Sequence, residues 1–205
     1  MSNPIILSGK KVSEQVYSDL SLKIKSLKEK GIVPGLAVIL VGEDPASKIY
    51  VRSKTKVFKK LGLYTKTYNF PDNIEEVEIL NLIAELNRKS SIHGILVQLP
   101  LPKQINPDLI INKILPEKDV DGFHPENAGL LSIGKPRFIP CTPKGIMKIM
   151  EYYNISLKNK HVVVIGRSNI VGRPISILTS LKTQFADGTT TICHSGTKNI
   201  EYFTK

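Results

Sequence analysis

An aromatic ring and an amine stand one helical turn apart in YVRSKTK, residues 50–56. Tyr50 and Lys54 are four residues apart, a spacing that brings two side chains onto one face of a helix. A lysine screened from water beside a ring has its charged form disfavoured, which suits the amine to proton transfer. The alternative is structural, because a lysine stem also packs over a half-buried ring without any chemistry. The choice depends on what other segments bring to this face.

Polar side chains that could join this pair follow a strand and occupy a loop. In VQLPLP, Gln98 stands where a buried strand ends, and ligands collect beyond the carboxyl ends of parallel strands. A single Gln in such a place more often anchors a loop than takes part in catalysis. KDVDGFHP offers Asp119, Asp121 and His124, each of which alone would be a turn former or an exposed charge. These residues are candidates only as a set.

A glycine-containing turn, GRSNIVGRP, lies between a hydrophobic strand and a helix, where backbone N–H groups can face phosphate. It departs from G-x-G-x-x-G, since Ser168 replaces the second glycine and Gly172 comes one residue late, and such turns also serve tight packing. The following strand ends in CHSGTK, with no carboxylate for a ribose 2′-hydroxyl, whereas Arg167 and Ser195 could hold a 2′-phosphate. The pattern favours NADP, with a carboxylate from another segment left as the alternative.

Alternating strand and helix patterns position these residues. We expect helices at about 10–30, 43–62, 73–88 and 143–154, a short helix from Asn106, strands at 35–42, 63–70, 94–102, 160–165 and 189–195, a helix after the glycine turn, and an ordered loop region at 116–140. The expected N-caps are Asp44, Asn73, Asn106 and Thr142. This alternation predicts an α/β fold with parallel sheets.

The composition is that of a globular protein. Of the 205 residues, 41% are hydrophobic, and no apolar run approaches the roughly 18 to 20 residues of a membrane span. The N-terminal MSNPIILSGKKVSEQ lacks the sections of a signal peptide, so we expect a cytoplasmic protein with no membrane partner. Cys141 and Cys193 have no C-x-x-C or C-H spacing, so no metal site and no disulfide framework are expected.

The net charge of +11 raises the question of nucleic acid, because a basic surface is the footprint of phosphate binding. The lysines are scattered among apolar positions, no aromatic-rich RNA motif is present, and tryptophan is absent. These features argue against a nucleic-acid partner. A lysine-rich solvated surface that also attracts small anionic ligands accounts for the charge.

Five segments, taken in order, resemble the signature motifs of the bifunctional methylenetetrahydrofolate dehydrogenase/cyclohydrolase family. They are YVRSKTK, GILVQLPLP, KDVDGFHPENAG, PCTPKGIM and VVVIGRSNIVGRP. The resemblance covers residues from about 36 to 195. It implies NADP-linked oxidation of 5,10-methylenetetrahydrofolate to 5,10-methenyltetrahydrofolate, then hydrolysis to 10-formyltetrahydrofolate, in one-carbon metabolism and purine biosynthesis. It also implies a homodimer of two-domain α/β subunits with a cleft between the domains.

The same resemblance implies a role for each motif residue. Lys54 would be the catalytic amine, Gln98 would orient it, and Tyr50 would stack on the folate ring system. Asp121 would bind the amino-pyrimidine edge of the pterin. The substrate-binding residues implied are Tyr50, Gln98, Leu99, Pro100 and Asp121, and the cofactor-binding residues implied are Gly166, Arg167, Ser168 and Ser195.

The domain boundary is expected near residues 139–143, which gives a folate-binding catalytic domain over 1–140 and a partial Rossmann-type NADP domain over 141–205. The family pattern continues beyond CHSGTKNIEYFTK, so the nucleotide domain is expected to be incomplete, with exposed sheet edges. A folate- or nucleotide-binding protein without turnover is therefore an alternative to an enzyme for this 205-residue chain.

Overall fold

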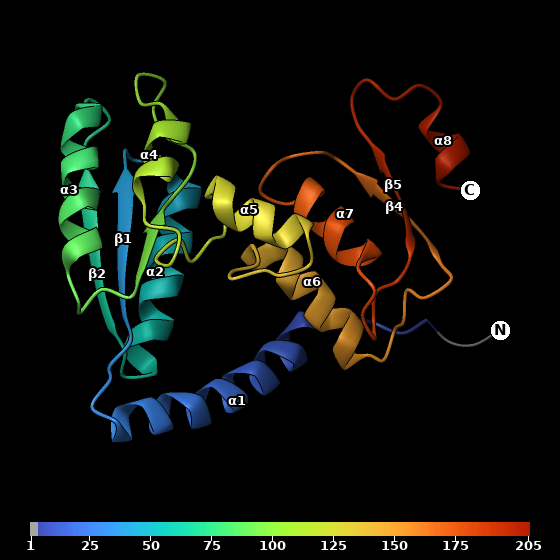
Figure 1. Cartoon of the computed structure of the whole chain (residues 1–205), viewed down its shortest axis with the longest axis horizontal. Helices are drawn as coiled ribbons and strands as arrows, with labels where there is room; N and C mark the ends of the chain where they lie inside the picture. The colour runs from blue at the N-terminus through green and yellow to red at the C-terminus, as the bar shows by residue number, and fades with distance from the viewer. Residues whose placement is uncertain (1–3) are drawn as a thin grey trace. The chain divides into compact units, whose positions relative to one another are not determined.

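The computed structural model describes residues 4–205, which divide into two compact units. The first unit comprises residues 19–126, and the second comprises residues 4–18 and 127–205 (Figure 1). Along the chain the elements are α1 (Gly9–Glu29), β1 (Gly35–Val41), α2 (Pro45–Lys60), β2 (Tyr64–Phe70), α3 (Glu76–Arg88), β3 (Gly94–Val97), α4 (Pro107–Lys113), α5 (Pro125–Ser132), α6 (Cys141–Tyr152), β4 (His161–Ile165), α7 (Gly172–Ser180), β5 (Thr189–Cys193) and α8 (Ile200–Phe203).

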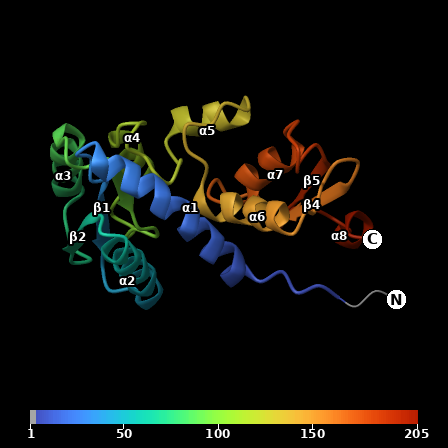
Figure 2. The same cartoon turned by 90° about the horizontal axis from the view of Figure 1, so that it is seen from below.

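The first unit contains a parallel sheet in the order β2-β1-β3, as the α/β pattern predicted. All seven residues of the central strand β1 are buried, which is why its sequence is continuously apolar. Alternate residues of β1 face two separate cores: one core includes residues of α3 and α4, and the other includes Val51 of α2. Helices therefore cover both faces of this sheet, α2 on one face and α3 with α4 on the other (Figure 2).

Helix α2 starts as its sequence predicts. The backbone N–H of Ser47 donates to Asp44 Oδ2 at 2.7 Å, and this cap holds the pKa of Asp44 below its usual value. Pro45 occupies the first turn, and Gly62 follows the helix with φ of 63°. Because Val51 is buried against the sheet, the rotation of α2 is fixed, and Tyr50 and Lys54 fall on one flank of the helix.

The second unit contains the expected β-α-β segment. Strands β4 and β5 pair in parallel, from His161 with Thr189 to Ile165 with Cys193, and α7 packs on both strands. The two strands are only partly covered, since Ile165 is 66% exposed and Ile192 is 40% exposed. This two-stranded sheet is less enclosed than the three-stranded sheet of the first unit.

Two expected N-caps are wrong. Asn73 was expected to cap α3, but the helix begins at Glu76, and its cap residue makes no side-chain hydrogen bond. Ile74 is 7% exposed and belongs to the core, so the chain stays in a turn until that side chain is buried. Thr142 was expected to cap α6, but it lies inside the helix, which begins at Cys141 after Pro140.

The loop expected at 116–140 contains helix α5. Its apolar residues do not form one stripe, and its buried side chains include Asn127, which periodicity does not detect. Arg137 Nη1 donates to Asn127 Oδ1 at 3.0 Å, which explains how this amide is accommodated in the interior. Strand β3 is also shorter than expected and ends at Val97, before the proline-rich segment.

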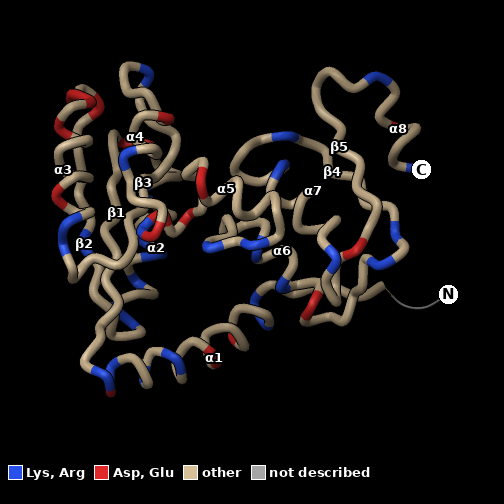
Figure 3. The backbone as a smooth tube through the Cα atoms, in the orientation of Figure 1, with Lys and Arg blue, Asp and Glu red and all other residues tan. Residues whose placement is uncertain are grey.

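Charged residues are distributed over most elements of the described chain rather than gathered on one of them (Figure 3). Within residues 4–205, no helix combines the length and apolar character needed to cross a membrane.

Candidate functional site

The amine of Lys54 and the amide of Gln98 meet in the first unit. Lys54 lies on α2, Gln98 directly follows β3, and Lys54 Nζ donates to Gln98 Oε1 over a long 3.4 Å. The backbone N–H of Gln98 donates to Ile39 O at 2.9 Å, and its Nε2 donates to Leu99 O at 2.9 Å. Because the Nε2 atom of Gln98 already donates to the Leu99 carbonyl, its other terminal atom, the acceptor Oε1, is the one that faces Lys54. The two side chains are in contact, as the sequence argument required, while their roles stay predictions.

Asp121 is the third charged or polar group of this site. Burial raises its pKa to about 6, the Lys54 ammonium opposes that rise, and the Asp119 carboxylate adds to it. Lys54 and Asp121 are thus electrostatically coupled, although they come from α2 and from the loop before α5. A buried carboxyl whose pKa is raised and which interacts with a nearby amine is typical of a functional site.

Tyr50 is 62% exposed and lies one turn before Lys54 on α2. The structural alternative, a half-buried ring covered by a lysine stem, does not describe this side chain. Leu99 and Pro100 continue from Gln98 through a cis peptide bond, Leu99 partly exposed and Pro100 exposed. An accessible ring and a short apolar segment beside an amine provide surfaces on which a flat ligand could stack.

Taken alone, Asp119 was expected to be a turn former or an exposed charge. It does form a turn, since its backbone oxygen accepts from the N–H of Gly122 at 3.1 Å, but it is not an exposed charge. Asp119 is 2% exposed, and its Oδ2 accepts a hydrogen bond from the backbone N–H of His124 at 2.8 Å. The sequence signal that could have indicated a buried Asp119 is its position two residues before Asp121. In the structure, Asp119 forms a bridge with Ile95 of β3. Such a carboxylate is inside the sheet layer and not at a loop tip.

The glycine turn of the second unit lies at the carboxyl ends of β4 and β5. Gly166 has φ of 128°, a conformation that favours glycine, and its N–H donates to Cys193 O at 2.7 Å. A Cβ on Gly172 would lie 2.3 Å from Gly166 O, so only glycine fits that approach. The hydroxyl of Ser168 accepts hydrogen bonds from the N–H groups of Val171 at 3.1 Å and Gly172 at 3.2 Å. Ser168 therefore shapes the turn through its own side chain.

Arg167 and Ser195 are both exposed and follow the ends of β4 and β5. The bond from Gly166 to Cys193 joins those two strand ends, so Arg167 and Ser195 extend from one edge of the sheet. No Asp or Glu stands in CHSGTK after β5 to bind a ribose 2′-hydroxyl. This donor set, with a cation and a hydroxyl and no carboxylate, fits a dinucleotide that carries a 2′-phosphate.

Across residues 4–205, no cluster of three or more His, Cys, Asp or Glu side chains is arranged to hold a metal ion. Cys141 is exposed and Cys193 is buried, and both thiols are free of disulfides.

Two domain families match the chain in the order of its two sites. The tetrahydrofolate dehydrogenase/cyclohydrolase catalytic domain matches residues 7–121, and the NAD(P)-binding domain of that family matches residues 140–205. The first range includes Lys54, Gln98 and Asp121, and the second includes the glycine turn.

Known proteins agree with this match. The chain is 49% identical over 195 residues to Bifunctional protein FolD 2 of Geobacter metallireducens, covering 95% of this chain and 67% of that protein. It is 50% identical over 200 residues to Bifunctional protein FolD of Ligilactobacillus salivarius, covering 98% and 69%. The chain therefore spans about two thirds of these relatives.

Solved structures give the same result. The bifunctional enzyme FolD, methylenetetrahydrofolate dehydrogenase/cyclohydrolase, of Campylobacter jejuni superimposes with a TM-score of 0.92 at 46% identity, covering 97% of this chain and 70% of that one. The methylenetetrahydrofolate dehydrogenase-cyclohydrolase of Trypanosoma brucei, solved with NADP cofactor and inhibitor, gives 0.91 at 32% identity, covering 98% and 68%. The chain belongs to the tetrahydrofolate dehydrogenase/cyclohydrolase family.

Proposed function

We propose that this protein oxidises 5,10-methylenetetrahydrofolate to 5,10-methenyltetrahydrofolate with NADP and hydrolyses the product to 10-formyltetrahydrofolate. The contact of Lys54 Nζ with Gln98 Oε1, inside the range that matches the catalytic domain, carries this proposal. Both reactions occur at one carbon that bridges two nitrogens of the folate. A single set of positioned side chains can therefore serve both.

Lys54 acts in the hydrolytic step. Water adds to the electron-poor methenyl carbon and forms a new C–O bond, while the amine form of Lys54 takes the proton. The bond from that carbon to the ring nitrogen then breaks as Lys54 returns its proton to the nitrogen and the new hydroxyl releases its proton to solvent, which leaves the formyl C=O on the other nitrogen. Gln98 accepts a hydrogen bond from Lys54 and so directs the amine toward the substrate.

Asp121 and Tyr50 hold the substrate. The ionised carboxylate of Asp121 accepts hydrogen bonds from the amino group and ring N–H of the pterin, a bidentate arrangement that fixes its orientation. Tyr50, 62% exposed, offers a ring face for stacking, and Leu99 and Pro100 provide apolar contact at the end of β3. These contacts place the one-carbon group near Lys54.

The cofactor site uses the second unit. NADP, when bound, accepts a hydride from the methylene carbon. Arg167 and Ser195 would hold its 2′-phosphate, and the part of the glycine turn that carries Arg167 and Ser168 would lie against its phosphates. The residues of the chain thus supply position and charge to the oxidation.

We also propose a catalytic domain over residues 1–140 and an NADP-binding domain over 141–205. The family ranges 7–121 and 140–205 support this division, whereas the compact units divide between residues 126 and 127. A cytoplasmic homodimer that delivers 10-formyltetrahydrofolate to purine biosynthesis is part of the same proposal. Light scattering of the purified protein measures the dimer directly.

Activity is tested by mixing the protein with 5,10-methylenetetrahydrofolate and NADP and following the absorbance of NADPH. The proposal predicts NADPH formation, then loss of the methenyl absorbance as hydrolysis proceeds. Calorimetric titration with each ligand accompanies the assay. Binding of folate or NADP with no NADPH would support the binding protein without turnover instead, and neither binding nor turnover by folded protein would exclude both functions.

A further inference from the structure

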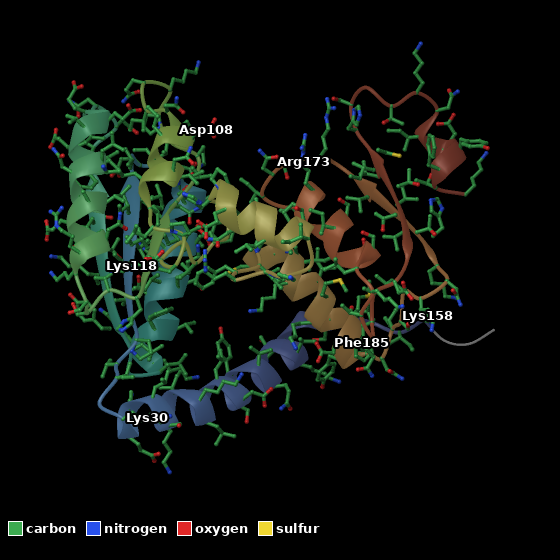
Figure 4. The ribbon with its side chains drawn as sticks, in the orientation of Figure 1. Lys30, Asp108, Lys118, Lys158, Arg173 and Phe185 are labelled. Atoms are coloured by element: carbon green, nitrogen blue, oxygen red, sulfur yellow. The ribbon has the colours of Figure 1, made fainter. Side chains whose placement is uncertain are left out.

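Lys118 makes three hydrogen bonds to the end of one helix. Its Nζ donates to Leu86 O at 3.0 Å, Asn87 O at 2.8 Å and Lys89 O at 3.0 Å. These carbonyls belong to the last turn of α3 and the residue after it. Leu86 O also accepts from the N–H of Lys89 at 3.2 Å, and Lys89 O also accepts from the N–H of Ile92 at 3.1 Å. An ammonium has three N–H donors, and here each has an acceptor. Figure 4 labels Lys118 beside α3.

The environment of this ammonium differs from that of a surface lysine. Burial lowers the pKa of Lys118 from its ordinary value, an effect that Glu117 opposes. The ammonium stands at the C-terminal, negative end of the α3 dipole, where a cation is favoured. The amine is therefore held in one place by charge-assisted bonds instead of moving with solvent.

The backbone of the same residue joins the edge of the sheet. The N–H of Ile95 in β3 donates to Lys118 O at 2.8 Å, and Asp119 forms a parallel bridge with Ile95. A Cβ on Gly94 would lie 2.4 Å from Val120 Cγ1, so this glycine permits the segment to approach the strand closely. Residues 118–120 are thus held by main-chain contacts with β3 and by the side chain of Lys118.

Asp121 follows directly on this fixed segment. The N–H of Gly122 donates to Asp119 O at 3.1 Å, and the Asp119 carboxylate accepts from the N–H of His124 at 2.8 Å. These two bonds close a tight turn around Asp121. The position of the Asp121 carboxyl, which interacts with the charge of Lys54, consequently depends on a turn that begins at Asp119, the residue after Lys118.

We propose that Lys118 is a positioning residue for the substrate site: its three bonds to the end of α3 fix the segment that holds Asp121 opposite Lys54. The inference rests on the proposed function, because it concerns how the folate is bound. It assigns to α3, which carries none of the substrate-site residues, the task of fixing one wall of that site.

Lys118→Met tests the proposal, since methionine keeps an unbranched chain and removes the three donors. Weakening the hydrogen bonds of Asp121 to the pterin removes binding that the ground state and the transition state share, so we expect KM for the folate substrate to rise by ~10-fold or more. The kcat at saturating substrate should stay within about twofold. Lys118→Arg, which restores a cation with several N–H donors, should recover most of the lost affinity.

A purely structural role gives a different result. Loss of folded protein lowers kcat, because fewer molecules are active, and leaves KM unchanged. Lys113→Met is the matched control, because Lys113 is an exposed lysine in the last turn of α4, outside the 118–124 segment. It should have wild-type KM. If Lys118→Met does not fold, Lys118→Gln, which keeps an amide donor, replaces it. This variant should also show a raised KM, by a smaller factor.

An unchanged KM in folded Lys118→Met or Lys118→Gln, with or without a lower kcat, would overturn the proposal. Failure of the proposed function is distinct from this outcome, because the wild-type protein would then turn over no folate at all. A rise in KM that Lys118→Arg does not reverse would also count against the role of the cation.

Discussion

The two candidate sites of this chain are built from different materials. In the first unit, Lys54, Gln98 and Asp121 come from three separate segments and meet through their side chains, and one of them has a pKa raised to about 6. In the second unit, the glycine turn is shaped by backbone approach at Gly166 and Gly172, and its side chains are exposed. Covalent chemistry requires side chains with altered proton affinity, whereas holding a phosphate requires only N–H groups and positive charge.

The two sheets also differ in how far they are buried. The three-stranded sheet is covered on both faces, and burial there can move the pKa of a carboxyl. The β4–β5 pair is partly open, and charges at an exposed turn are screened by solvent and salt. Substitutions at the buried site of the first unit should therefore change chemistry and stability, and substitutions at the glycine turn of the second unit should change mainly the affinity for the cofactor.

The largest effect is expected for Lys54→Met. A positioned acid or base typically contributes 100-fold to 10,000-fold, so hydrolysis of 5,10-methenyltetrahydrofolate should fall by ~1,000-fold. The measurement is the decay of the methenyl absorbance under saturating substrate. Lys56→Met, an exposed lysine on the same helix, is the control and should hydrolyse at close to the wild-type rate. Near-normal hydrolysis by Lys54→Met would remove the amine from the mechanism.

Asp121→Asn should stabilise the fold while it weakens folate binding. The folded pKa of about 6 is above the ordinary value of 3.8, so ionised Asp121 costs stability at neutral pH. The difference corresponds to roughly 3 kcal/mol, complete above about pH 7, declining as pH falls through 6 and absent below pH 3.8. Denaturant unfolding should therefore give Asp121→Asn a higher free energy of unfolding than wild type at pH 7.5 and a similar one at pH 4.

Asp108→Asn provides the control for this measurement, since Asp108 is an exposed residue in the first turn of α4 (Figure 4). Its effect should stay within about 1 kcal/mol and be slightly destabilising, because a negative charge is favoured at a helix N-terminus. A loss of stability in Asp121→Asn at pH 7.5 would contradict the burial argument.

Gly172→Ala should act on the cofactor alone. The new Cβ would meet Gly166 O at 2.3 Å and Arg167 N at 2.8 Å, so the turn must shift. We expect KM for NADP to rise by ~10-fold, with methenyl hydrolysis unchanged. Gly145→Ala in α6 is the matched control, because nothing lies within 4 Å of its added Cβ. Equal loss of both activities in Gly172→Ala would remove the contrast between the two regions.

Ser168→Ala should have the smallest effect. It removes the acceptor for the N–H groups of Val171 and Gly172, and a hydrogen bond of this kind contributes about 1 kcal/mol. KM for NADP should increase by about fivefold, measured in the same assay. An unchanged KM would mean that backbone geometry alone maintains the turn.

The parts of the fold that follow from local rules were predictable. Asp44 and Pro45 fix the start of α2, Asn106 caps α4 with a bond to Asp108 N of 2.9 Å, and the apolar run of β1 indicated a strand buried on both faces. The predictions that failed depended on long-range burial. The side chain of Ile74 is buried in the core, and α3 begins only after it. Helix α5 buries the amide of Asn127, whose hydrogen-bond donor, Arg137, is ten positions away.

For the site, the sequence by itself determined the residue types and their order, including the helical spacing of Tyr50 and Lys54 and the glycines of the turn. Tertiary structure alone decided which of them share a charge environment. Asp119 alone was expected to be a turn former or an exposed charge, yet it is 2% exposed. No sequence pattern distinguished Lys118, yet it binds three carbonyls at the end of α3. Burial and carbonyl partners arise from chain segments about 30 residues apart, so no local pattern could encode them.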